Sequence, residues 1–316
     1  MTALTSANSA FLNAETDFGL NMLRQSPISG PLIVSPISVI FALAMVQAGA
    51  KGKTKTQINK VISNGATDDA IVEFYSNLAK DILKATNGVQ TRIANAFFLD
   101  KEYTIEKPYE DTIIQKYSAK VEALDFRQPQ QTAKKIDAFV SEKTAGKINN
   151  FITEKMVKGA FSLIVNAVYF TAKWEYGFPK ESASNKTFYS AENATKEIEF
   201  LNEFYADRYY AEDADMQVLF GLDELRKKMN GAGIQKVLSQ LRRTFVTISI
   251  PKMKIETDFK LKEALIAMGI TEMFNDWADL TGIAKEPPLK VSDAAHKAII
   301  EVSVCTFSLW NCEERL

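Results

Sequence analysis

The chain has 316 residues, of which 46% are hydrophobic and 24% charged, an ordinary globular composition with enough apolar side chains for a large core. This composition excludes collagen-like, disordered and coiled-coil structures. Lysine plus arginine number 38 and aspartate plus glutamate 39, so the net charge of −1 provides no field that attracts polyanions, and we expect neither nucleic-acid nor membrane partners.

The first half of the chain carries mainly helical patterns. Apolar residues at helical spacing predict an amphipathic helix over 6–23. Ser35 as cap and Pro36 at the first helical position begin a second helix over 37–47, which is apolar almost all round and must therefore lie inside the protein. Thr54 and Gln57 have the spacing of a capping box and predict the start of a third helix. Further helices are predicted at 67–86, 106–119 and 130–145, and a strand at 90–99.

The second half adds the strands. Residues 161–170 are almost entirely apolar and predict a strand that is buried on both faces. Strand-like segments follow at 187–189, 196–205 and 244–256, and the last strand covers 299–302, extending back at most to Leu289. Helices are predicted at 221–230, 233–241 and 259–268. The pattern indicates an α+β fold.

Cysteine usage and the apolar segments indicate the cellular location. The only cysteines are Cys305 and Cys312, so no disulfide framework holds the fold together. No Lys or Arg precedes Arg24 and no unbroken apolar stretch follows, so we predict no signal peptide and a cytoplasmic protein. The most apolar stretch, 31–50, is interrupted by proline and polar residues and is predicted to be buried core.

Residue chemistry alone predicts no active site. Gly52-Lys53-Thr54 resembles the end of a phosphate-binding loop, but Gln47 stands where that motif needs glycine. His296 is the only histidine, which excludes metal sites with two histidines. Because His296 lies in a predicted strand, a hydrogen-bonded structural role is favoured over a general base. We therefore expect no enzyme activity, no metal and no cofactor.

Eight segments together resemble the serpin family of serine-protease inhibitors, and they occur in the family's order. They are LIVSPISV (32–39), AGAKGKTKTQI (48–58), KINNFI (147–152), LIVNAVYFTAKW (163–174), ISIPKMKIE (248–256), LKEALIAMGITEMF (261–274), ADLTGI (278–283) and VSDAAHKAIIEV (291–302). The style of these motifs and the absence of a signal peptide make the chain similar to intracellular, nematode-like members.

The resemblance implies a monomeric domain over 1–302 with helices over a large central β-sheet, and a serine or cysteine protease as partner. It assigns Ser35, Ser38, Asn166 and His296 to the shutter, a buried hydrogen-bond cluster beneath the centre of that sheet. Asn166 interrupts an apolar strand and needs partners, which the two hydroxyls and the imidazole could supply. Trp174 matches the breach, where the family's reactive loop first enters the sheet, although simple core packing is an equally good interpretation.

Two departures from the family concern inhibition. In serpins an acidic-Gly-Thr hinge, an alanine-rich stretch and the scissile bond follow the last matching segment, whereas here residues 303–316 read SVCTFSLWNCEERL. We therefore expect a divergent tail in place of the hinge, reactive bond and final strands, in a chain truncated before the reactive loop. An internal deletion near 219–220 is expected to leave the smaller backing sheet incomplete.

These departures leave several hypotheses open. The first is a serpin by descent that does not inhibit proteases. The alternatives are a non-inhibitory binding protein that uses Phe307, Leu309 and Trp310 as an apolar contact, and an unproductive isoform or gene-model artefact. An extracellular location, as for many family members, is the alternative to the cytoplasm.

Overall fold

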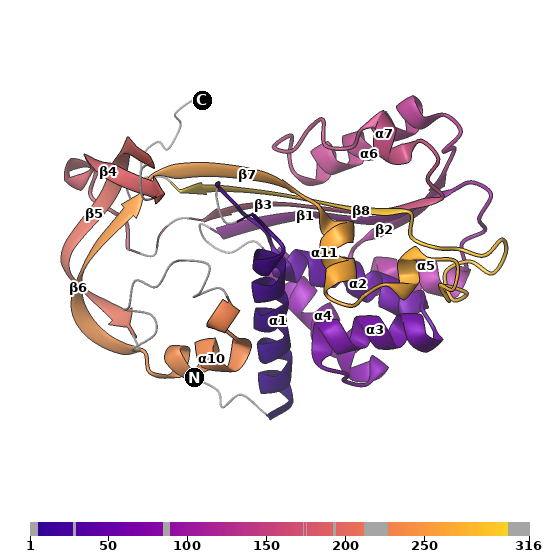
Figure 1. Ribbon diagram of the computed structural model, residues 1–316, viewed down its shortest axis with the longest axis horizontal. Helices are drawn as coiled ribbons and strands as arrows, with labels where there is room; N and C mark the ends of the chain where they lie inside the picture. Colours follow the sequence, from indigo (N-terminus) through magenta and orange to yellow (C-terminus); the bar gives the residue numbers. More distant parts are fainter. Residues whose placement is uncertain are drawn as a thin grey trace.

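The computed structural model describes residues 6–27, 30–84, 89–172, 174, 176–191, 194–211 and 227–302 (Figure 1). Its helices are α1 (Ser6–Arg24), α2 (Pro36–Gly49), α3 (Gly52–Ser63), α4 (Asp68–Leu83), α5 (Lys107–Tyr117), α6 (Pro129–Lys143), α7 (Glu154–Val157), α10 (Gly231–Ser239) and α11 (Leu261–Ala267), with 3-10 turns η1 (Lys180–Ser182) and η2 (Glu272–Phe274). Its strands are β1 (Val89–Asp100), β2 (Lys120–Leu124), β3 (Ser162–Ala172), β4 (Ser184–Ala191), β5 (Ala194–Tyr210), β6 (Arg242–Pro251), β7 (Met253–Phe259) and β8 (Asp293–Val302).

The larger sheet has five described strands in the order β2-β1-β3-β8-β7. The pairs β1–β2 and β3–β8 are parallel, whereas β1–β3 and β7–β8 are antiparallel. Strand β3 lies at the centre, and its residues from Ser162 to Tyr169 are buried. The near-continuous apolar run of this segment is explained by that position, since a central strand covered on both sides has no face for water.

Helices cover both faces of this sheet. Helices α6 and α7 lie on one face, and α1 to α5 with α11 lie on the other (Figure 1). Helix α2 is buried from Ser38 to Gln47, which confirms the prediction that this apolar segment lies inside the protein. No helix within the described ranges is long and apolar enough to cross a membrane.

The smaller sheet has the order β4-β5-β6 within the described residues. Strand β5 carries an irregularity between Glu203 and Ala206, where Tyr205 adopts a positive φ of 50°. The α+β prediction, with helices over a large sheet and a smaller second sheet, is confirmed.

The predicted capping box at the start of α3 is wrong. The helix begins at Gly52, and Thr54 is a buried residue of its first turn whose hydroxyl accepts a hydrogen bond from the Asp279 amide at 3.0 Å. The Gln57 side chain reaches away from α3, and its Oε1 accepts the amides of Thr271 and Glu272 at 2.9 and 2.8 Å. Partners more than 200 residues away have thus replaced the local ones.

Other boundaries shift by a few residues. Phe259, predicted as the start of a helix, is the last residue of β7, and β8 begins at Asp293, between the two predicted limits. The expected deletion near 219–220, most of the predicted helix at 221–230 and the tail 303–316 lie outside the described residues.

Candidate functional site

A row of polar side chains crosses the middle of the larger sheet. The strand register places Asn95 of β1 opposite Asn166 of β3, and Asn166 opposite His296 of β8. Phe259 of β7 continues the row, and its ring meets the imidazole edge-on at a centroid distance of 6.3 Å. The three polar side chains are almost completely buried. Buried polar groups of this kind need hydrogen-bond partners from within the protein.

Asn166 is the hub of this row. Its Nδ2 donates to the Ser38 carbonyl at 2.9 Å and to the Asn95 Oδ1. Its Oδ1 accepts the Ser38 hydroxyl at 2.9 Å and faces the His296 Nδ1 at 2.5 Å. Both donors and both acceptor positions of the amide are therefore used, which explains how an asparagine is accommodated in an otherwise apolar strand.

The partners of His296 determine its charge state. Its Nε2 accepts a hydrogen bond from the Ser35 main-chain amide at 3.1 Å, so that nitrogen carries no proton. The proton of the neutral ring must then lie on Nδ1, which donates to Asn166. Burial lowers the pKa of His296 to about 3, because the imidazolium would lose its hydration in this site.

Ser35 and Ser38 contribute differently to the cluster. Ser38 uses its hydroxyl and its carbonyl on Asn166. Ser35 takes part through its main chain: its amide binds His296, and its carbonyl accepts the Ser38 hydroxyl at 3.1 Å. The structure therefore brings together all four residues that the sequence analysis placed in the shutter, but the Ser35 hydroxyl is not the group that acts.

Asn95 is the member of the row that sequence reasoning missed. It lies in a segment whose alternating pattern predicted a strand, and nothing local distinguishes it from any other polar residue of β1. Its role depends on the β1–β3 register, which brings it opposite Asn166. An asparagine on the covered face of a predicted strand was the only available signal.

The row of polar side chains crosses the junction between β3 and β8. The two strands run parallel from the Leu163–Asp293 pair to the Phe170–Ile300 pair. The hydrogen bond between Asn166 and His296 links the two strands side chain to side chain at this junction. Any separation of β3 from β8 would therefore break it.

Trp174 lies beyond the end of β3 and does not take part in the polar row. Its ring is 38% exposed and packs edge-on against Phe178 at a centroid distance of 5.4 Å. The contact is apolar, and the exposed part of the indole faces solvent. Trp174 is therefore only partly a core residue.

The chemistry of the row is structural. His296 is inaccessible to solvent, and both ring nitrogens are engaged, so it cannot take a proton from a bound substrate in this arrangement. Within the described part of the chain, no three potential metal-ligating side chains lie together. The site is thus a buried hydrogen-bond cluster that connects the start of α2 to the three strands β1, β3 and β8.

Comparisons with known proteins agree with this architecture. Residues 13–304 match the family model described as Serpin (serine protease inhibitor). Human Serpin B3 is 30% identical over an alignment that covers 96% of this chain and 86% of that protein. The crystal structure of uncleaved ovalbumin superposes with a TM-score of 0.85 at 23% identity, covering 94% of this chain and 91% of ovalbumin. Human thyroxine-binding globulin, solved with its hormone, gives a TM-score of 0.86 at 20% identity, covering 97% and 89%.

Proposed function

Because this chain belongs to the serpin family, whose members are generally serine protease inhibitors, we propose that it retains the family's sheet and shutter but does not trap proteases. The observation that carries the proposal is the sequence of residues 303–316, which replaces the family's hinge and reactive loop. The buried row of Asn95, Asn166 and His296 acts in this proposal as the shutter, which keeps β3 and β8 together.

Inhibition in this family requires a cleaved loop to enter the sheet as an extra strand and to carry the acylated protease with it. Within the described residues, β3–β8 is the central parallel pair, and a hydrophobic core packs against each of its two faces. Alanines line the junction on both sides: Ala167 and Ala295 belong to the core beneath α6 and α7, and Ala294 belongs to the core beneath α2. Because the core on both faces of this pair is close-packed, an entering strand with large side chains would clash with it, whereas small side chains would fit best.

The segment that follows β8 does not meet this requirement. It contains Phe307 and Trp310 where the family has small residues, and its last residue to match the family model is 304. Large side chains in a close-packed core cost about 1–3 kcal/mol each. An acidic-Gly-Thr hinge is also absent from residues 303–316. The large side chains and the missing hinge both support the proposal that this chain keeps the serpin sheet but has no segment that can insert into it.

A binding function is the second candidate. It is favoured by the likeness to human thyroxine-binding globulin, which was solved in complex with thyroxine, because the same fold there serves ligand binding. For the remaining assignments we propose a monomer in the cytoplasm, with an extracellular location as the alternative. The lack of a disulfide framework supports the cytoplasmic assignment, since the two cysteines both lie in the divergent segment 303–316.

The test is incubation of the purified chain with a panel of serine and cysteine proteases, followed by denaturing electrophoresis. We expect cleaved fragments and no complex that survives denaturation. The control is a chimera in which the corresponding segment of human Serpin B3 replaces residues 303–316. A covalent complex with the unmodified chain would refute the proposal, whereas a complex with the chimera alone would locate the defect in that segment.

A further inference from the structure

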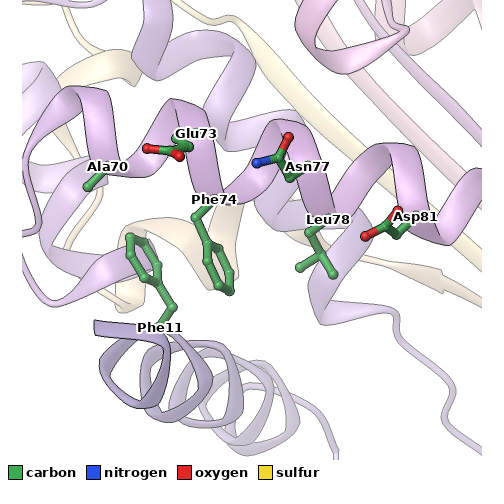
Figure 2. Close-up of a pocket in the computed structure, with 7 residues that line it drawn as sticks. All are labelled: Phe11, Ala70, Glu73, Phe74, Asn77, Leu78 and Asp81. Carbon is green, nitrogen blue, oxygen red and sulfur yellow. The ribbon is translucent and has the colours of Figure 1, made fainter. Parts of the chain in front are cut away.

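An open groove runs along one face of α4, beside the beginning of α1. It is lined by residues at helical spacing on α4 and by one residue of α1, and its volume is about 430 Å³ (Figure 2). The lining residues are Phe11, Ala70, Glu73, Phe74, Asn77, Leu78 and Asp81. On α4 they extend over 12 residues, from Ala70 to Asp81, which corresponds to a length of about 16 Å. The groove therefore suits an elongated occupant.

The apolar wall of the groove is built from aromatic rings that pack against one another. The rings of Phe11 and Phe74 stack at a centroid distance of 4.2 Å with an interplanar angle of 7°. Tyr75 packs edge-on against both rings, and its hydroxyl is anchored on the Ile62 carbonyl at 2.5 Å. Phe74 and Leu78 remain only partly covered. Because these rings are already packed, the side chains of the wall lose little conformational entropy when an occupant binds.

The charge of the groove has one sign. Glu73 and Asp81 are the charged members among the described residues that line it, and both are exposed. No ion pair of Glu73 is present within the described residues, whereas Asp81 contacts Lys84 at 2.7 Å. Both side chains of that pair are about 70% exposed, so it contributes little and an incoming cation can displace it. The groove is therefore complementary to positive charge.

We propose that this groove binds a basic, amphipathic helical segment of a partner protein. Glu73 and Asp81 lie eight residues apart on α4, which separates their positions by about 12 Å along the helix axis. Figure 2 shows the two carboxylates on separate turns, with Phe74 and Leu78 along the helix between them. A partner helix with Lys or Arg at the same spacing and leucines between them would pair both charges and cover the apolar wall. None of the described residues that line this surface belongs to the β3–β8 junction.

The probe is a fluorescein-labelled, alanine-based helical peptide with two lysines eight residues apart and leucines between them. A matched peptide carries glutamates in place of the lysines. Binding to the full chain is measured by fluorescence anisotropy at low and high NaCl. We expect only the lysine peptide to bind, and we expect its affinity to fall as salt rises because the carboxylates are exposed.

Variants of the full chain locate the site. The double variant Glu73→Gln/Asp81→Asn should weaken the lysine peptide by about two- to twentyfold, as expected for two exposed ion pairs. The matched control is Asp69→Asn, which removes an exposed carboxylate of α4 that does not line the groove. Circular dichroism checks that each variant is folded. Equal binding of the glutamate peptide, no binding of either peptide, or an equal loss in the control would each overturn the proposal.

Discussion

Replacement of Asn166 by alanine tests the polar row most directly. In the folded protein this change removes the partner of the His296 Nδ1 proton and the partner of the Asn95 Oδ1. Ser38 is less affected, because its hydroxyl also donates to the Ser35 carbonyl. Each buried group left without a partner costs about 1–3 kcal/mol, so we expect Asn166→Ala to lower the free energy of unfolding by about 2–6 kcal/mol.

The matched perturbation is Asn95→Ala, which removes a single partner of the same hub. It leaves only one Nδ2 proton of Asn166 unpaired, and we expect it to lower the free energy of unfolding by about 1–3 kcal/mol. In the double variant, Asn95→Ala should cost less than it does in the wild type, because the interaction it removes is already absent.

Urea unfolding, followed by circular dichroism and tryptophan fluorescence, gives the free energies of unfolding for all four proteins. We expect these four values to give a clear coupling energy between positions 95 and 166. If Asn166→Ala costs less than about 1 kcal/mol, or if the two changes are additive, Asn166 is not the hub that its contacts indicate.

Three further predictions concern pH and packing. His296 has a pKa of about 3 in the folded protein against 6.5 in the unfolded chain, so the stabilisation that is present above pH 6.5 should be lost as pH falls toward 3. His296→Gln should remove this pH dependence from the free energy of unfolding, measured by urea unfolding at several pH values. Burial raises the pKa of Glu15 from 4.5 to about 7, so the contribution of Glu15 to the free energy of unfolding is fully present below pH 4.5 and is lost as pH rises through 7. Glu15→Gln should abolish that loss in the same urea experiments, and an unchanged pH profile would contradict the prediction. A Cβ at Gly231 would lie 2.5 Å from the Asn13 carbonyl of α1, so Gly231→Ala should lower the thermal midpoint, whereas Gly233→Ala, in the same helix and exposed, should not.

The two titrations oppose each other between pH 4.5 and 6.5. As pH falls through this window, the titration of His296 lowers the free energy of unfolding, whereas the titration of Glu15 raises it. We therefore expect a flat profile for the wild type there, and opposite slopes for the two single variants. Parallel slopes for both variants would contradict the assigned directions.

Several elements could be predicted because their signals are local. Pro36 at the first helical position and the apolar run that follows identified α2 and its burial, since both signals depend on residues within a few turns. Ser35 stands at the N-cap position, but its side chain makes no capping hydrogen bond. The unbroken apolar segment of β3 likewise indicated a strand covered on both faces. The same kind of reasoning failed for Thr54 and Gln57, whose partners lie in the segment 271–279.

The sequence by itself determined the family, the α+β class and the presence of a buried asparagine and histidine that needed partners. Only the tertiary structure decided which partners they have. Asn166 meets Asn95 across 71 positions of the chain and His296 across 130, because the strand order β1-β3-β8 and its register place them in one row. Register arises from pairing between distant segments, which no local pattern encodes, and this is why Asn95 and the main-chain role of Ser35 emerged only from the fold.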